Sequence, residues 1–178
     1  MRRLGWKLGL AALVVGLLGV AAAPPIVEAG GRLKARVYLT QRKIPKKLTE
    51  RGLLGFMRRN NAKRLRETTG KPLDERKFKA EMVTAFNRAP GDLEFHVLFY
   101  DVHNGSRKFV EDMSTFINDR TQKVFLQRVR LPRPRFKPNR RMELVVTVKR
   151  AEVGKLKFTT DGEEKKRSGK VDFSDDET

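Results

Sequence analysis

The chain of 178 residues contains no cysteine, and this absence excludes several kinds of chemistry. Without a thiol there is no disulfide bond, no cysteine nucleophile and no zinc site built on thiolates. Histidine is almost absent too, since only His96 and His103 occur. One falls in the middle of a predicted strand and the other borders a turn. We therefore interpret both as structural residues rather than as metal ligands.

Catalytic motifs are also missing. The sequence has no Gly-x-Ser-x-Gly elbow and no glycine-rich phosphate loop. Asp101, His103 and Ser106 have the residue types of a catalytic triad, but neighbours on one turn rarely point at a common atom. Asp101 with Glu111 or Asp112 would be a pair of carboxylates across a hairpin, without the spacing of an EF-hand. We predict no enzyme activity, no cofactor and no metal, with a hydrolase at this hairpin as the least favoured alternative.

Acidic residues are scarce relative to basic ones. Against 40 lysines and arginines the chain has 21 aspartates and glutamates, a formal net charge of +19. Arg2, Arg3, Lys7 and Glu28 give the first thirty residues a net charge of +2, which leaves +17 on the rest. A charge of this size favours association with anionic partners and carries no information about the fold.

Residues 1–29 have the order of a secretory signal peptide. A positive start is followed by the uncharged run Leu8–Ala23, then by Pro24 and Pro25, and then by the small-x-small pattern of Val27–Ala29. The alternative is an uncleaved membrane anchor. A spanning helix needs about 20 apolar residues, and this run reaches that length only by including the prolines. We expect an exported protein, periplasmic or extracellular, with the N-terminally anchored form as the alternative.

The remaining chain is dominated by short segments in which apolar and polar residues alternate. A period of two is typical of half-buried strands. One segment, 93–102, is apolar on both faces and is expected in the centre of a sheet, and the blurred pattern that follows it is expected at an edge. In the segment 141–150 the alternation places Glu143 on the outer face. The seven predicted strands are 32–40, 77–86, 93–102, 107–119, 122–131, 141–150 and 155–161.

These strands and their turns favour an immunoglobulin-like antiparallel β-sandwich. The strongest turn signal is Asn104-Gly105, which suits a hairpin between 93–102 and 107–119. We expect one domain over 30–162, because no disulfide is available and one buried core must provide the stability. The tail 163–178 has few large apolar residues and is expected to be flexible.

The segment 48–67 is the one predicted helix. Thr49 is the expected N-cap, and Gly70 and Pro72 are expected to end the segment. Its apolar side is expected to cover Leu98 and Tyr100 on the outer face of the strand 93–102. At a spacing of 3.6 residues, the apolar side comprises Leu53, Leu54, Met57 and Leu65, and the basic side comprises Arg59, Lys63 and Arg66.

The segment Leu131–Arg141, LPRPRFKPNRR, combines five basic residues with three prolines. Proline cannot donate to a strand ladder and favours a bend, so we predict that this corner carries the chain from one sheet to the other. Phe136, Pro138 and Asn139 before an alternating strand resemble the strand-connecting corner of immunoglobulin-like sandwiches. The resemblance implies the sandwich architecture and no activity. The paired cysteines and core tryptophan of antibody domains are absent, because the single Trp6 lies in the leader.

Three interpretations of the basic corner stay open: a solvated loop, a surface for a polyanion, and a proline-rich peptide ligand. We expect a non-enzymatic binding or scaffold protein of the cell envelope that holds an acidic polymer or lipid. The alternative is a subunit of an envelope or secreted assembly, docking through a sheet edge or the helix. Nucleic acid is not an expected partner. The candidate polyanion-binding residues are Arg59, Lys63, Arg66, Arg128, Arg130, Arg133, Arg135, Lys137, Arg140 and Arg141.

Overall fold

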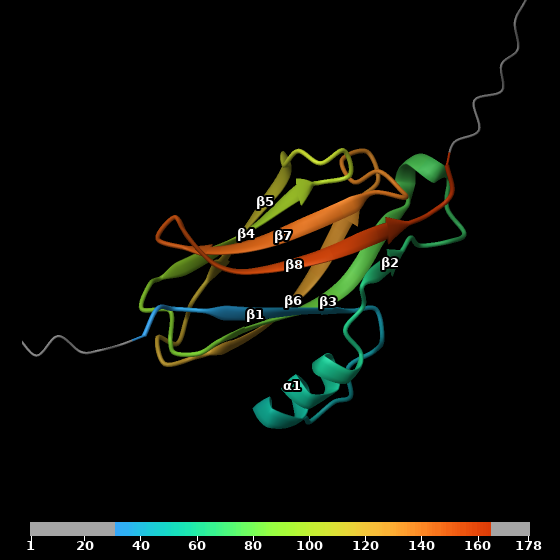
Figure 1. Ribbon diagram of the computed structural model, residues 1–178. Coiled ribbons are helices and arrows are strands. Elements are labelled where there is room, and N and C mark those ends of the chain that lie inside the picture. The colour runs from blue at the N-terminus through green and yellow to red at the C-terminus, as the bar shows by residue number, and fades with distance from the viewer. Residues whose placement is uncertain (1–30, 165–178) are drawn as a thin grey trace, which may run out of the picture. The chain divides into compact units, whose positions relative to one another are not determined.

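The computed structural model of the protein describes residues 31–164. The predicted signal peptide, and the predicted tail from 165 onward, lie outside this range. The described part consists of two β-sheets packed face to face and one α-helix (Figure 1). The predicted mainly β class, the two-sheet sandwich and the inserted helix are therefore confirmed.

Sheet A has three antiparallel strands in the order β1 (Ala35–Thr40), β3 (Lys77–Phe86) and β6 (Val124–Pro132). The alternation in β3 places Phe78, Ala80, Met82 and the next two even-numbered residues on the buried inner face. The strand pairs with both neighbours, which agrees with its central position.

Sheet B has five strands in the order β2 (Arg64–Arg66), β8 (Ala151–Asp161), β7 (Arg141–Val148), β4 (Glu94–Asp101) and β5 (Lys108–Phe116). The central place of β4 and the edge place of β5 are both as predicted. The parallel pairing of β2 with β8 was not predicted.

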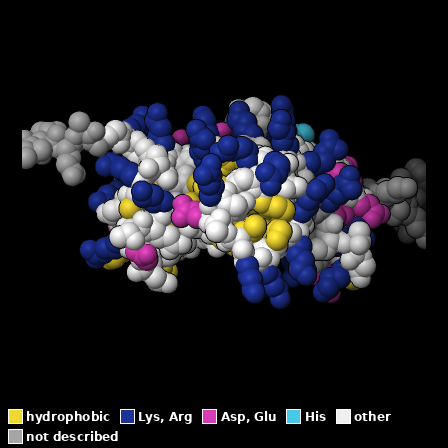
Figure 2. Space-filling view, turned by 90° about the horizontal axis from the view of Figure 1, so that it is seen from below, with side chains coloured by type: hydrophobic (Ala, Val, Ile, Leu, Met, Phe, Trp, Pro, Cys, Tyr) yellow, Lys and Arg dark blue, Asp and Glu magenta, His cyan; other side chains and the backbone are white. Residues whose placement is uncertain are grey.

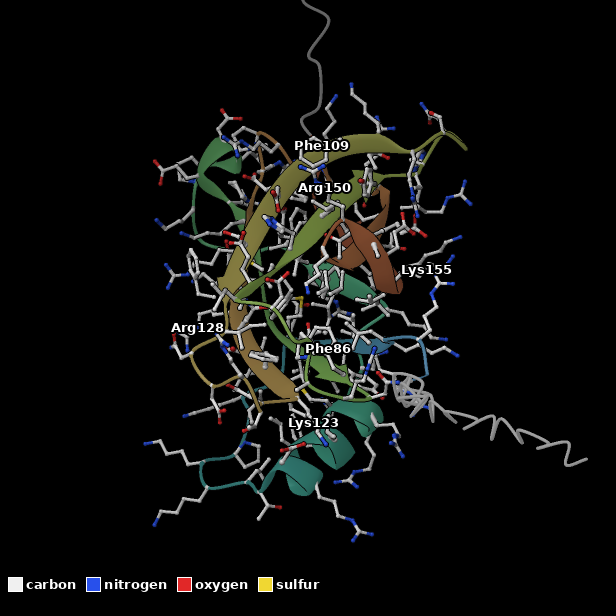
Figure 3. All side chains as sticks on the ribbon, turned by 90° about the vertical axis from the view of Figure 1, so that its left-hand side faces the viewer. Phe86, Phe109, Lys123, Arg128, Arg150 and Lys155 are labelled. Carbon is white, nitrogen blue, oxygen red and sulfur yellow. The ribbon has the colours of Figure 1, made fainter. Side chains whose placement is uncertain are left out.

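The core lies between the inner faces of the two sheets. Three rings from both sheets, Phe86, Phe95 and Phe125, meet edge to face with centroids 5.1–5.8 Å apart. Figure 3 shows Phe86 inside the sandwich. On one side the sheets approach closely, because a Cβ added at Gly154 of β8 would overlap the carbonyl oxygen of Ala35 in β1. Glycine is therefore required at this position.

Helix α1 (Glu50–Arg59) begins as predicted but is shorter. The N–H of Gly52 donates to Thr49 Oγ1 at 3.2 Å, which confirms the N-cap. The helix ends at Arg59, with Asn60 as its C-cap, so the predicted end near Gly70 is wrong. Residues 64–66 form β2 instead, with Leu65 fully buried in the core. A single apolar residue between two arginines fits a strand as well as a helix, and pairing with β8 decides in favour of the strand.

The predicted packing of the helix is also wrong. Helix α1 contacts β1 and β3 of sheet A rather than β4 of sheet B. Val83 of β3 is fully buried although it lies on the face opposite to the core, and Met57 of α1 is fully buried too. The helix therefore covers the outer face of sheet A (Figure 1).

The corner Leu131–Arg141 connects β6 of sheet A with β7 of sheet B, as predicted. Phe136 is fully buried and meets Phe99 edge to face at 5.6 Å. Asn139 has a φ of 55°, in the left-handed region that asparagine tolerates better than most residues. The corner is thus anchored to the core by its own aromatic ring. A short 3-10 helix, η1 (Leu73–Glu75), precedes β3.

Candidate anion-binding surfaces

The arginines of the corner are largely engaged within the fold. Arg133 is only 9% exposed, and its Nη1 donates to Glu67 Oε2 at 2.6 Å. Arg135 forms an ion pair with Glu111. These two predicted ligands of a polyanion therefore neutralise carboxylates of the chain itself.

Glu67 is the centre of a partly buried cluster of charges. Arg76 Nη1 lies 2.9 Å from Glu67 Oε1 and 3.0 Å from Glu163 Oε2, and the N–H of Glu163 donates to Glu67 Oε1. Burial acts to raise the pKa of Glu67. The hydrogen bonds from Glu163 and Arg76 and the charges of Arg133 and Arg76 outweigh it, so this pKa is lowered. The cluster ties the corner to the ends of β2 and β8.

The other cations of the corner are surrounded by groups of both signs. Lys137 and Arg140 line an open depression together with Asp74 and Glu164. Arg141 Nη2 donates to the carbonyl oxygen of His103 at 2.9 Å. In the folded protein, the surroundings of the corner are therefore less positively charged than its own sequence suggests.

The remaining predicted ligands are distributed over both sheets. Arg128 and Arg130 lie on the outer face of sheet A, where Arg128 Nε is 3.0 Å from Glu81 Oε1. Arg66 lies on β2 of sheet B, 4.0 Å from Asp161. Figure 3 shows Arg128 projecting from β6 on one side and Lys155 from β8 on the other. The ten predicted residues thus do not form one patch.

A long run of cations without carboxylate partners lies before and within α1. Over 42–59 the chain has seven lysines and arginines and one acidic residue, Glu50. Within residues 31–164, no carboxylate oxygen lies within 4.0 Å of any of the seven. All seven are exposed. We call them the helix-side cations: Arg42, Lys43, Lys46, Lys47, Arg51, Arg58 and Arg59.

Among the helix-side cations only Arg59 belonged to the predicted set. The excess of basic residues over 42–59 is visible in the sequence, but the proline-rich corner is the more conspicuous basic segment. Figure 2 views the face that carries α1 and shows lysine and arginine side chains around a smaller number of hydrophobic ones. One of the apolar residues of this segment, Leu48, is 39% exposed.

A second basic region lies on the outer face of sheet B. Here the charged residues that line an open groove of about 600 Å³ are Lys63, Arg141, Lys157 and the paired Arg107 and Glu143, and Lys155 follows on β8. Lys63, Arg141, Lys155 and Lys157 have no carboxylate within 4.0 Å among the described side chains. We call them the sheet-B cations. Two of them, Lys63 and Arg141, were predicted ligands, and the structure brings these two together.

Arg107 shows the opposite arrangement on the same face. Its Nε donates to Glu143 Oε2 at 2.7 Å and its Nη1 to Glu152 Oε1 at 2.8 Å, and its Cζ lies 5.1 Å from the centre of the Tyr100 ring. Glu143 was predicted on the outer face and lies there, but it is buried, because these groups cover it. Arg107 is therefore part of the fold and is not available to a ligand.

The residues considered for catalysis are placed as follows. His96 Nδ1 lies 3.2 Å from Asp112 Oδ2, and Asp101 Oδ1 accepts the backbone N–H of His103 at 2.8 Å. Within the described range no three His, Asp or Glu side chains are grouped as a metal would require. Ser106 is exposed in the loop between β4 and β5. None of the helices over 31–164 has the length and hydropathy of a membrane span.

No family model matches the chain, and no curated protein does. Among solved structures, an immunoglobulin-like protein from Pseudomonas aeruginosa is similar over 73% of this chain and 92% of its own, with 11% sequence identity and a TM-score of 0.36. At these values the likeness carries no information about what the chain binds.

Proposed function

We propose that the protein is a non-enzymatic binding protein that holds an acidic polymer or an anionic lipid layer on its helix-side cations. One observation carries this proposal: seven exposed cations with no carboxylate partner among the described residues, on one helix and the loop before it. A cation already paired with a carboxylate must lose that partner before it binds a ligand. The helix-side cations have no such competition.

The expected strength of binding follows from the number of these charges. Each lysine or arginine near an anionic surface contributes about 1 kcal/mol, so a group of seven supplies on the order of 7 kcal/mol. This corresponds to a dissociation constant of about 10 μM. Part of the gain comes from release of counterions, so binding weakens steeply as salt is added.

The predicted location agrees with this role. If the leader exports the chain, the anionic partners it meets are envelope lipids and acidic polymers rather than nucleic acid. Because the leader lies outside the described residues, export stays a prediction from the sequence alone.

Reversal of charge on the helix side tests the proposal. Lys43→Glu, Lys46→Glu and Lys47→Glu are combined in one variant, and retention is measured on an acidic polymer matrix and on vesicles of phosphatidylglycerol. We expect loss of retention at a salt concentration that retains the unaltered protein, with an unchanged melting temperature.

A matched variant distinguishes binding by the helix-side cations from binding that depends only on the net charge of the protein. Arg88, Lys108 and Arg120 are exposed cations outside the segment 42–59, and no carboxylate described in the structure lies within 4.0 Å of them. Their combined change to glutamate gives the same net charge as the helix-side variant. Retention close to that of the unaltered protein supports the proposal, whereas equal loss in both variants shows that net charge alone governs binding.

A second function, docking within a protein assembly, is supported by the edge strand β5. Phe109 and Phe116 on this strand are 55% and 72% exposed, which is unusual for large aromatic residues. Association through such an edge would change little with salt, because apolar contacts and backbone pairing would drive it. Complexes that persist at 1 M salt would favour this function over the electrostatic one.

A further inference from the structure

We infer that the outer face of sheet B is a second lipid-binding surface, and that the protein bridges two anionic lipid layers. The first surface is the helix side, so the bridging rests on the proposed function. The second surface consists of the sheet-B cations Lys63, Arg141, Lys155 and Lys157.

The two surfaces face in opposite directions. Helix α1 lies against the outer face of sheet A, while the sheet-B cations lie on the outer face of the other layer. In Figure 1, α1 lies below β1 and sheet B lies above it. A flat lipid layer on one surface therefore leaves the other accessible.

The sheet-B cations are arranged to meet a flat layer. Lys155 and Lys157 alternate along β8 on its outer side, about 7 Å apart. Lys63 and Arg141 lie beside Lys157 around the groove. The only described helix of several turns lies on the other sheet, so no helix covers this face.

Exposed apolar side chains favour lipid over a soluble acidic polymer on both surfaces. Leu48 adjoins the helix-side cations, and on sheet B the half-exposed Phe109 packs edge to face on Tyr100 at 5.9 Å. A polymer offers charge alone, whereas an anionic bilayer offers charge and an apolar layer beneath it.

The two surfaces act independently of each other. Two packed sheets lie about 10 Å apart and a helix adds about 10 Å, so the surfaces are separated by roughly 20 Å. The Debye length at physiological salt is about 8 Å. Lipid bound on one surface therefore does not screen the cations of the other.

Glu143 and Glu152 lie within the second surface, where both are paired with Arg107, and other acidic groups limit its extent. Asp92 and Glu94 line a separate depression at the far end of the same face, and Asp112 lies beside His96 there. These carboxylates would be repelled by an anionic layer. Contact is therefore confined to the end of sheet B away from these carboxylates, where Lys157, Tyr100 and Phe109 lie in one row across β8, β4 and β5.

Clustering of vesicles measures bridging directly. Vesicles of phosphatidylglycerol and phosphatidylcholine are titrated with the full chain, and light scattering reports clustering while cosedimentation reports binding. We expect clustering that rises and then falls as protein is added, because excess protein occupies every vesicle surface separately.

One variant removes the second surface while leaving the first intact. In Lys63→Gln, Lys155→Gln and Lys157→Gln combined, three of the four sheet-B cations are lost, and affinity of that face should fall about 100-fold or more. Clustering should disappear while cosedimentation through the helix side changes by less than about threefold. The helix-side variant should instead lose most of its cosedimentation.

The outcomes separate the two proposals. Binding without clustering, or unchanged clustering in the sheet-B variant, overturns the bridging inference and leaves the proposed function standing. Retention on an acidic polymer without binding to vesicles overturns the choice of lipid. No retention on either material overturns the proposed function itself. A protein dimer on the vesicles would cluster them even in the sheet-B variant, so that variant also excludes bridging by self-association.

Discussion

The corner Leu131–Arg141 and the segment 42–59 are both rich in basic residues, and they differ in what these residues contact. In the corner, Arg133 and Arg135 form ion pairs with Glu67 and Glu111. In the segment 42–59, no cation has a carboxylate within 4.0 Å among the residues described. Arg133 is buried within the fold and Arg135 is neutralised at its surface, whereas the cations of 42–59 are available to an external anion.

This difference shows that local charge density in a sequence does not measure available charge. The partners of the corner arginines are distant in sequence, since Glu67 precedes Arg133 by 66 residues and Glu111 precedes Arg135 by 24. The fold brings these carboxylates to the corner. The loop before α1 projects from the sandwich (Figure 1), and the carboxylates of the described sheets do not come within ion-pair distance of its cations.

The largest effect is expected from breaking the partly buried cluster of the corner. In Arg133→Met the side-chain volume is nearly kept, but Glu67 loses one of its two arginine partners. Glu67 keeps Arg76 and the N–H of Glu163, so the loss should be that of one unsatisfied hydrogen-bonding group, about 1–3 kcal/mol. Chemical denaturation would measure this loss.

A second change at the same site sharpens the test. In the double variant Glu67→Gln and Arg133→Met no buried carboxylate is left without its partner, so much of the lost stability should return. A double variant as unstable as Arg133→Met would mean that packing of the Arg133 side chain, rather than its charge, is what matters.

The pH dependence of stability is the next expected effect. The pKa of Glu67 is lowered in the folded protein from its ordinary value of 4.5. Its ionised form therefore contributes stability that is fully present above about 4.5 and is lost as pH falls through the lower, folded value. Melting temperatures between pH 6 and pH 2 should show this loss, and it should shrink in Glu67→Gln. An identical profile in both proteins would contradict the assignment.

The layered fold could be predicted because alternation of apolar residues is a local property. Seven of the eight strands over residues 31–164 were predicted from their apolar patterns, and the corner follows from its prolines. The interior position of β4 in sheet B and the edge position of β5 could also be predicted from the sequence, since β4 is apolar on both faces and β5 is not. Each of these features depends on residues that are neighbours in sequence.

The wrong predictions concern features that depend on contacts between residues distant in sequence. Leu65 lies among arginines in a pattern that a helix and a strand share, and only its pairing with β8 shows which one forms. The side of the sandwich covered by α1 depends on the path of the loop before it, which the sequence pattern does not specify. Glu143 is buried because Arg107, far along the chain, covers it.

The candidate site was harder to predict from the sequence than the fold, for the same reason. Whether a lysine or arginine is available depends on every carboxylate near it in space. The helix-side cations are distinguished by the local scarcity of acidic residues over 42–59, and that signal can be read from the sequence. The sheet-B cations come from three separate segments, and only the register of β2, β7 and β8 brings them together.

A moderate effect is expected at the start of α1, on the side of the unpaired cations. Thr49→Ala removes the acceptor of the Gly52 N–H and should cost about 1 kcal/mol. If the helix presents the cations as a unit, affinity for anionic vesicles should fall together with helix content, which circular dichroism would measure. Thr49→Ser keeps the acceptor and should restore both. Loss of stability with full affinity would show that the cations bind without an ordered helix.

The smallest effect on stability is expected from the helix-side cations themselves. Arg58→Ala removes an exposed side chain without a carboxylate partner in the described structure, so stability should change by less than about 0.5 kcal/mol. The same change should weaken binding to an acidic polymer and reduce the slope of log affinity against log salt by roughly 0.7–0.9. Arg133→Met should do the reverse, with a large loss of stability and an unchanged salt slope. If Arg58→Ala destabilised the protein as much as Arg133→Met does, the division between structural and available cations would be wrong, because both groups would then hold the fold together.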